Sequence, residues 1–225
     1  MASRYRTRRL IGALIILLVS VFGLLTNPQL YEQTAPTPQT SQVSDSPALE
    51  ELANLPVKKG KAPKTGYDRT QFGNGWTTTQ GCDTRNIILH RDLKNPVVDE
   101  GCKVVSGTLH DPYTGKTILF QRGAGTSQLV QIDHVVALSN AWQTGAQQLR
   151  PDQREELAND PLNLLAVDGA ANQQKSDGDA ATWLPANKPF RCQYVARQVS
   201  VKKKYNLWVT TPEKETAQRV LMRCA

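Results

Sequence analysis

The pattern of apolar and polar residues divides the chain into three parts. Residues from Leu10 to Leu25 form an uncharged, mostly apolar run of 16 residues. Residues 27–46 are rich in Pro, Thr, Ser and Gln with almost no aliphatic periodicity, which is typical of a disordered linker. The pattern therefore predicts a hydrophobic segment within residues 1–26, a linker at 27–46 and a single folded domain at 47–225.

The first half of the predicted domain contains a helix and a β-hairpin. The stretch SPALEELANL has apolar residues roughly on one face, with Ser46 as the expected N-cap and Pro47 at the first helical position. The lysine-rich residues 58–66 predict a loop. Residues 102–120 predict two strands joined by the turn DPYTGK, because β-branched and aromatic residues flank a centre that contains Pro and Gly.

The central part of the domain alternates strands and helices. Residues 128–138 (QLVQIDHVVAL) predict one strand and residues 161–169 (PLNLLAVDG) a second one. Residues 139–160 between them predict helices or a helical excursion, and residues 170–179 (AANQQKSDGD) predict the start of a helix. The expected order is strand, excursion, strand and helix.

Two supporting helices are expected at the C-terminus. Residues 191–205 have helical apolar spacing and end in three lysines, 202–204, which are expected to form a solvated helix end that complements the helix dipole. Residues 211–225 begin with Thr211 as the expected N-cap and Pro212 at the first helical position. The complete pattern predicts an α+β fold.

The apolar run follows arginines at positions 4, 6, 8 and 9, with no acidic residue. This order is typical of an export segment. The run is slightly longer than the apolar region of a signal peptide (about 7–15 residues) and shorter than a comfortable membrane span (about 20). A cleaved signal peptide and an uncleaved anchor, touching the membrane only through residues 10–25, both stay open. In either case the domain is expected to be extracellular, either secreted or tethered to the outer face of the membrane.

Net charge adds little to this picture. The formal charge is +7, but the four N-terminal arginines would not meet an extracellular partner, and the remaining chain carries +3. This mild excess does not by itself predict a nucleic-acid-binding protein.

The four cysteines agree with export. Cys82, Cys102, Cys192 and Cys224 contain no CxxC pair, which argues against a zinc knuckle and for two structural disulfides in an oxidising compartment. Three connectivities are possible. We expect Cys82 to pair with Cys102 and Cys192 with Cys224, because near neighbours form local loops.

Polar residues gather where the central strands end. Asp133 and His134 close the first strand, Asn163 precedes the second apolar run, and Asn172 and Lys175 share a face of the following helix. An Asp-His pair alone could be a structural pair at a strand end, but the combination is more specific. Consecutive strand residues point to opposite faces, so Asp133 and His134 can serve one site only if the strand ends or bends there.

On these motifs the chain resembles the HNH nucleases of the ββα-metal superfamily. It is more closely similar to exported bacterial HNH endonuclease family proteins related to the GmrSD restriction-endonuclease C-terminal domain. The matching stretches are GYDRTQFG, GCDTRNIILHRDL, DPYTGKTILF, IDHVVALSNAWQTGA, NDPLNLLAVDGAANQQKSDGDAATWLP and YVARQVSVKKKY. They cover most of residues 66–224. The resemblance implies a single domain with a ββα-metal (HNH) core, an additional hairpin and supporting C-terminal helices.

The resemblance also implies an activity and a set of roles. The expected reaction is metal-dependent hydrolysis of phosphodiester bonds in DNA, with RNA as an alternative, leaving 5′-phosphate and 3′-hydroxyl ends. His134 is expected to activate water, since an unperturbed imidazole has a pKa of about 6.5. Asp133 and Asn172 are expected to hold the metal, and Asn163 to tie the loop that orients His134. An oxygen ligand set suits Mg²⁺ or Mn²⁺ better than zinc.

Two cations are expected to contact nucleic acid. Lys175 would bind a flanking phosphate as a point charge, and Arg85 in the stretch CDTR would reach another. Lys175 as a solvated surface residue, and Arg85 as the partner of Asp83 in a loop, stay open. The remaining conspicuous residues are expected to be structural: Asp177 and Asp179 in a turn and an N-cap, His90 and His110 outside the site, and Trp142 and Trp183 in the core.

Three functions follow from these observations. The first is a metal-dependent extracellular nuclease whose partner is nucleic acid, DNA foremost, with no obligate protein partner. The second is a non-catalytic nucleic-acid-binding module at the cell surface. The third is a wall-associated structural domain stapled by disulfides. The complete set of Asp133, His134, Asn163 and Asn172 favours the first.

Overall fold

The computed structural model describes residues 47–224, which form a mixed α and β fold with small sheets and seven α-helices. The segment 1–26, the linker 27–46 and the expected cap at Ser46 lie outside the described residues. Within residues 47–224, no helix is long and apolar enough to cross a membrane.

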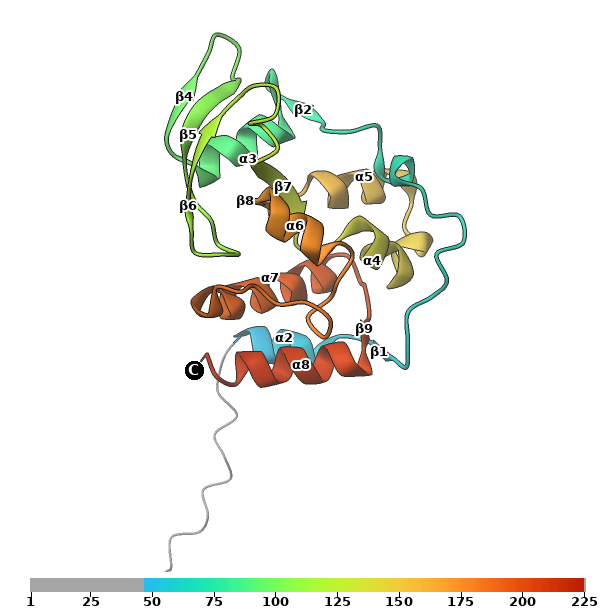
Figure 1. Ribbon diagram of the computed structural model, residues 1–225. Coiled ribbons are helices and arrows are strands. Elements are labelled where there is room, and N and C mark those ends of the chain that lie inside the picture. Colours follow the sequence, from blue (N-terminus) through green and yellow to red (C-terminus); the bar gives the residue numbers. More distant parts are fainter. Residues whose placement is uncertain (1–46, 225) are drawn as a thin grey trace, which may run out of the picture. The chain divides into compact units, whose positions relative to one another are not determined.

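The two central strands form an antiparallel pair. β7 (Val130–His134) and β8 (Leu164–Asp168) place His134 opposite Leu164. The elements between them are α4 (Leu138–Gln143), the short helix η3 (Ala146–Gln148) and α5 (Pro151–Asn159), and α6 (Gly169–Lys175) follows β8 directly. The predicted order of strand, helical excursion, strand and helix is confirmed, and Figure 1 shows α6 beside the two strands.

A glycine allows the close approach of α6 to the chain before β7. A Cβ atom at Gly169 would lie 2.1 Å from the backbone oxygen of Gln128. No side chain fits there without a shift of the backbone. The start of α6 is therefore fixed against the start of β7.

The expected hairpin is present and has a third strand. β5 (Val104–His110) and β6 (Thr117–Gln121) are antiparallel, and β4 (Lys94–Val98) pairs with the other edge of β5. α3 (Thr84–Asp92) contacts this sheet on one side and β7 and β8 on the other. Its Ile88 and Leu89 are fully buried in a core that also contains Phe120, Ile132 and Leu164.

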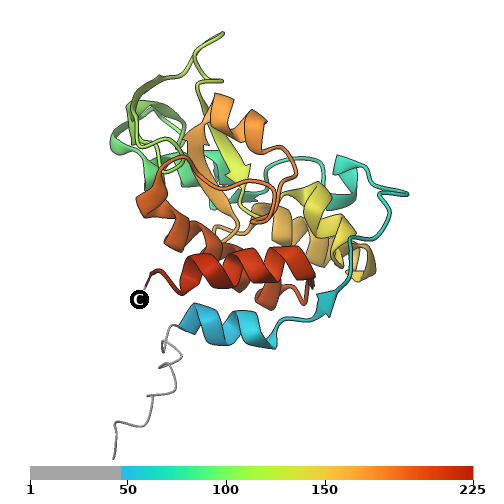
Figure 2. The same ribbon diagram turned by 60° about the horizontal axis from the view of Figure 1, so that its bottom comes forward.

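Helices from both ends of the described chain share a second core. α2 (Pro47–Asn54), α7 (Arg191–Lys204) and α8 (Thr211–Leu221) pack with Val167 of β8 and Ala171 of α6. Figure 2 shows α2 and α8 side by side. The remaining short elements are β1 (Val57–Lys58), which is parallel to β9 (Val209–Thr210), the antiparallel pair β2 (Thr78–Thr79) and β3 (Cys82–Asp83), and the short helix η4 (Lys188–Phe190).

Two details of the C-terminal helices differ from the prediction. The N-cap of α8 is Thr210 rather than Thr211, because the Thr210 side chain accepts a hydrogen bond from the Glu213 N–H and Glu213 completes the capping box. The lysines at the end of α7 are not all solvated. Lys202 is buried, with its Nζ 2.7 Å from Glu213 Oε1 and 3.0 Å from the Trp208 carbonyl oxygen, because α8 and the preceding turn cover this end of α7.

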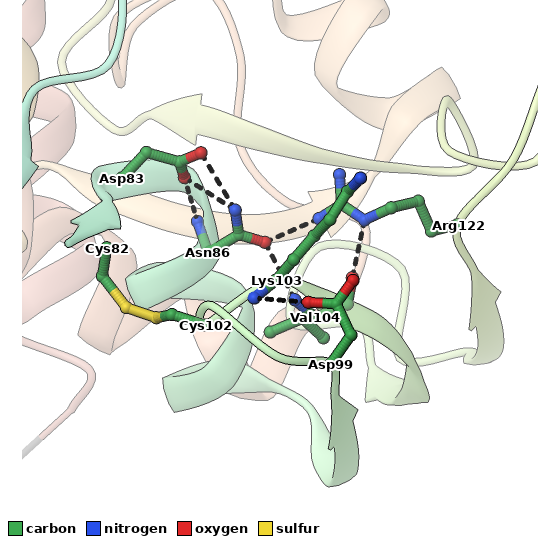
Figure 3. Close-up of a disulfide and its surroundings, with 8 residues drawn as sticks. All are labelled: Cys82, Asp83, Asn86, Asp99, Cys102, Lys103, Val104 and Arg122. Carbon is green, nitrogen blue, oxygen red and sulfur yellow. Dashed lines mark hydrogen bonds between the residues drawn. A yellow bond between two sulfur atoms is a disulfide. The ribbon is translucent and has the colours of Figure 1, made fainter.

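Both expected disulfides are present: Cys82 with Cys102, and Cys192 with Cys224. The first joins the start of α3 to the turn between β4 and β5, and Figure 3 shows its surroundings. Asp83 caps α3 by accepting a hydrogen bond of 2.7 Å from the Asn86 N–H. Asn86 Oδ1 in turn accepts from Val104 N–H at 3.0 Å. The start of α3 and the edge of the hairpin are thus fixed together.

Residues 59–76, which we call the crossing segment, run along α4 to the end of β7. Ala62 N–H donates to the Gln143 carbonyl at 2.9 Å, and Trp142 Nε1–H donates to the Thr65 carbonyl at 3.2 Å. The segment contains the short helix η2 (Arg69–Phe72), and Phe72 is buried in a third core with Trp142. These contacts hold the second half of the crossing segment beside the end of β7.

Candidate functional site

A cleft of about 580 Å³ opens where β7 ends. It is lined by β7, α4, α6, Arg85 of α3 and the crossing segment. The residues of interest on its walls are Lys64, Arg69, Trp76, Arg85, Gln131, Asp133, His134, Ser139, Asn172 and Asp177. Asp133 and His134, which are adjacent in the sequence, and Asn172, which comes from a later segment, therefore face one cavity.

His134 is held in one orientation at the end of β7. Its Nε2 lies 2.9 Å from the carbonyl oxygen of Ala158. A carbonyl only accepts hydrogen bonds, so Nε2 carries the proton and Nδ1 keeps its lone pair. The ring also stacks on Trp76, with centroids 5.8 Å apart and planes inclined by 12°. The imidazole is thereby oriented with one free acceptor nitrogen.

Burial keeps this imidazole neutral. It lowers the pKa of His134 to about 3, because the charged form loses its hydration, and the charges of Arg69 and Lys175 act in the same direction. The hydrogen bond to Ala158 acts against this shift. At neutral pH the ring can therefore accept a proton, and the negative charge of a bound phosphodiester would raise this pKa.

The strand ends where the site requires it. β7 stops at His134, and residues 135–136 form a bend. Asn163, which is fully buried, fixes this bend: its Oδ1 accepts from Val136 N–H at 2.8 Å, and its Nδ2 donates to the carbonyls of Val136 and Leu157, each at 3.3 Å. Asp133 and His134 consequently line the same cleft although they are consecutive strand residues.

Asp133 is held by two buried partners. Lys175 Nζ lies 3.0 Å from Asp133 Oδ1, and the Tyr113 hydroxyl donates to Asp133 Oδ2. Burial raises the pKa of the Asp133 carboxyl, and Lys175 and Tyr113 act against this rise. Lys175 also donates to the His134 carbonyl at 2.8 Å. One lysine thus fixes both the carboxylate and the backbone of the neighbouring histidine.

The position of Lys175 differs from the expected one. Its side chain is 0% exposed and it does not line the cleft. A lysine enclosed in this way does not suit contact with a flanking phosphate, and it is not a solvated surface residue either. The reason is that α6 presents this position toward the buried carboxylate of Asp133 rather than toward the opening of the cleft.

Asn172 leaves an oxygen available. Its Nδ2 donates to Gln131 Oε1 at 2.8 Å, and its Oδ1 has no hydrogen-bond partner within residues 47–224. The bond to Gln131 orients the amide so that the oxygen is the free atom. Asn172 therefore offers an acceptor on the wall of the cleft that also carries Asp133.

This donor set fits a hard divalent cation that keeps part of its water shell. In the described part of the chain, no group of three or more His, Cys, Asp or Glu residues could hold a metal ion. Each carboxylate oxygen of Asp133 has a second lone pair beyond its hydrogen bond, and Asn172 adds an amide oxygen. Two oxygen ligands with water completing the coordination suit Mg²⁺ or Mn²⁺ and do not suit a closed zinc site.

Cationic residues border the cleft. Arg85 is half-buried and donates to the carbonyls of Val130 at 3.3 Å and Ser127 at 3.5 Å. It does not pair with Asp83, whose carboxylate binds Asn86. Lys64 pairs with Asp177 across the cleft wall. Arg69 makes no ion pair or side-chain hydrogen bond with the residues that the structure describes, and the residue is exposed.

The residues expected to be structural are found in such positions. Asp179 accepts from the Ala181 N–H and pairs with Lys61 at 2.8 Å. His90 and His110 are exposed and do not line the cleft. Trp142 is buried, and Trp183 packs against the core of α7 and α8. Asp177 differs in lining the cleft, where it accepts from Ser139 Oγ at 3.1 Å.

Among the residues of the site that were not predicted from the sequence are Arg69, Trp76, Tyr113 and Gln131. Trp76 and Tyr113 belong to segments far from the central strands, and each meets the site only through the tertiary fold. The position of Gln131 in the site could have been predicted from the sequence. It lies two residues before Asp133 on the same strand, and alternate strand residues share a face.

Comparison with known proteins gives two findings. The family described as GmrSD restriction endonucleases, C-terminal domain, matches residues 83–218, which include β7, β8 and α6. A protein of Arthroderma benhamiae described as an uncharacterized secreted protein is 35% identical over 193 residues, which cover 84% of this chain and 91% of that protein. No solved structure matches the chain. Arg69 and Trp76 lie before the part that the family matches.

Proposed function

Since the chain belongs to the family of GmrSD restriction endonuclease C-terminal domains, we propose that it is an exported, metal-dependent endonuclease of the HNH type. Its reaction is hydrolysis of phosphodiester bonds in DNA, with RNA as a second substrate to be tested. The strongest support is that Asp133, His134 and Asn172 line one cleft although they come from β7 and α6.

The chain's own residues have distinct tasks in this reaction. His134 Nδ1 takes a proton from the attacking water, while the Nε2–H bond to Ala158 and the stack on Trp76 keep the ring in place. Asn163 holds the bend that follows His134. Asp133 and Asn172 would hold the divalent cation, which when bound offsets negative charge on the phosphate and on the departing 3′ oxygen.

Lys175 and Tyr113 act as positioning residues. Both contact Asp133 from inside the protein, so they fix the direction of its carboxylate without touching the substrate. Partners of this kind typically change metal affinity or activity by about 10–100-fold when they are removed. Arg85, which lines the cleft, would contact a phosphate of the nucleic acid.

Export is part of the proposal. The relative from Arthroderma benhamiae is described as secreted, and two disulfides suit an oxidising compartment. The basic and apolar start of the chain would direct export, either as a cleaved signal peptide or as an anchor. The proposed location is outside the cytoplasm.

The alternative function is a non-catalytic module that binds nucleic acid at the cell surface. The cationic border of the cleft is compatible with it, because phosphates would bind there without hydrolysis. The oriented imidazole with one free nitrogen favours catalysis, since simple binding does not require it. A wall-associated structural domain would not account for the cleft.

A plasmid-nicking assay on the full-length chain separates these functions. Nicking and linearisation are expected with Mg²⁺ or Mn²⁺ and are expected to stop with a chelator. The same assay is repeated with Ca²⁺ and with Zn²⁺ as the divalent ion. His134→Ala should abolish cleavage while leaving the circular dichroism spectrum unchanged. His90→Ala is the matched control, because His90 is exposed and lies outside the cleft. Intact plasmid in every wild-type sample, together with salt-sensitive binding, would replace the nuclease by the binding module.

A further inference from the structure

A second cavity shares part of its lining with the cleft, including His134. It has a volume of about 170 Å³ and is lined by Arg69, Phe72, Gly73, Gly75, Trp76, His134, Leu138 and Ala158. Four of these residues also line the cleft: Arg69, Trp76, His134 and Leu138. The general base of the proposed reaction therefore lines both cavities.

We propose that this cavity receives one unstacked nucleobase of the substrate strand, so that the preferred substrate is single-stranded or locally melted nucleic acid. The inference rests on the proposed nuclease function and adds a substrate class to it. It is carried by the chemistry of the cavity walls and by their continuity with the cleft.

The walls suit a flat, largely apolar group. Phe72 and Trp76 contribute aromatic rings, and Leu138 and Ala158 contribute aliphatic surface. At Gly75 the space beside the backbone is open, since an added Cβ would meet no atom within 4 Å. A phosphate alone would leave these walls unmatched. A nucleobase has a π-face for stacking on an aromatic side chain and needs no particular sequence for it.

The charge of the cavity suits a polyanionic strand. Among the described residues that line it, Arg69 is the only Lys, Arg, Asp or Glu. None of the described lining residues carries a carboxylate, and the carboxylate of Glu155 lies beside the backbone of Gly73, outside the lining. Arg69 also lines the cleft, and its guanidinium is free of ion pairs with other described residues. It is placed to contact the phosphate that connects a base in the cavity to the nucleotide in the cleft.

Duplex substrate does not enter such a cavity without distortion. A base in a double helix is stacked on its neighbours and paired, and taking it out of the stack requires unpairing and unstacking. A base in a single strand has no pairing to lose. We therefore expect the ratio kcat/KM for a single strand to exceed that for the same sequence as a duplex by about tenfold or more.

Scanning a substrate with a base-free residue tests the subsite directly. The full-length chain would cleave an end-labelled single strand, and a series of strands that each carry one tetrahydrofuran residue in place of a nucleotide. Cleavage at one linkage next to the base-free residue should fall about tenfold, equivalent to about 1.4 kcal/mol. All other linkages should be cut as before. A fixed offset between the base-free residue and the protected linkage identifies the neighbour whose base binds.

Variants of Trp76 connect this effect to the cavity. In Trp76→Leu the linkage next to the base-free residue should be cut as fast as the other linkages. In Trp76→Phe most of the reduction in cleavage at this linkage should remain. Each value is a ratio between two linkages cut by the same variant, so a general loss of rate or of folded protein cancels. Retention of full protection in Trp76→Leu would place the base elsewhere.

The outcomes separate the two levels of the proposal. Equal cleavage of intact and base-free strands, with single strand and duplex cut at the same rate, would overturn the subsite and leave the nuclease intact. Absence of cleavage on every substrate by a chain with a native circular dichroism spectrum would overturn the nuclease, and the subsite with it.

Discussion

Lys175 and Asp133 form an ion pair inside the protein, with 3.0 Å between Nζ and Oδ1 and side-chain exposures of 0% and 6%. The pair joins the last residue of α6 to the penultimate residue of β7. A buried charge without its partner is costly, so neither residue can be removed without a large effect on the other. The metal ligand in the proposed reaction is therefore part of the core of the protein.

Replacing Lys175 should affect both folding and function. Lys175→Met leaves the Asp133 carboxylate buried without a cation, and we expect the free energy of unfolding to fall by about 3–5 kcal/mol. The measurement is urea unfolding followed by fluorescence. Lys202→Met is the matched control, because Lys202 forms a comparably buried pair with Glu213 outside the cleft. Both variants should lose stability, but at a temperature where both are folded only Lys175→Met should lose nuclease activity.

Tyr113→Phe removes one hydroxyl from the site. The Tyr113 ring is fully buried and should keep its packing, while Asp133 Oδ2 loses its hydrogen bond. We expect a metal concentration for half-maximal activity that is about 10–100-fold higher. Tyr205→Phe serves as the control, because Tyr205 donates to Asp160 at 2.8 Å in a similarly buried position away from the cleft. An equal effect of both variants on metal dependence would contradict the positioning role of Tyr113.

Asn163→Ala should loosen the bend after His134. The substitution leaves the Val136 N–H without its acceptor and two carbonyls without their donor, and we expect a stability loss of about 1–3 kcal/mol. Asn163 does not line the cleft, so KM should change little while kcat falls. Steady-state kinetics on a short oligonucleotide provide the measurement. An unchanged kcat in a folded variant would show that the bend does not orient His134.

The ion pair between Asp179 and Lys61 should make stability depend on acid pH. Burial alone would raise the pKa of Asp179. Its interactions with Lys61 and with the Ala181 N–H outweigh this effect, so the pKa of Asp179 lies below its ordinary value of 3.8. A carboxylate with a lowered folded-state pKa stabilises the protein above its unfolded pKa and loses this contribution as the pH falls.

The comparison of Asp179→Asn with the wild type tests this linkage. The variant should be less stable at neutral pH, and the difference should shrink as the pH falls through about 4 and below, where the wild-type carboxylate becomes protonated. Thermal unfolding at several pH values measures it. A difference that stays constant from neutral to strongly acidic pH would show that charge is not the cause.

The local elements of the fold were predictable because their signals are local. The hydrophobic periodicity predicted β7, β8 and the helices between and after them. The expectation that cysteines close in the sequence pair with each other predicted both disulfides. The cap of α8 was placed one residue late, since Thr210 and Thr211 carry the same side chain and only the backbone distinguishes them. The set of Asp133, His134, Asn163 and Asn172 was found from the strand ends and the family resemblance.

Tertiary burial was not predictable in the same way. Lys175 and Lys202 appear as ordinary cations in the sequence, yet each is buried and paired with a buried carboxylate on another element. Trp76 meets His134 only because Ala62 and Thr65 hold the crossing segment along α4. A composition or a periodicity carries no information about such long-range partners.

The crossing segment contributes to the cleft a wall that lies outside the residues matched by the family. Lys64, Arg69 and Trp76 precede residue 83, where the family match begins, whereas Asp133, His134 and Asn172 lie within it. The residues proposed to hydrolyse the phosphodiester bond and the residues proposed to select single-stranded nucleic acid thus belong to different segments of the chain. Loop exchange across residues 59–76 would be a direct way to retarget such an enzyme while its reaction stays the same.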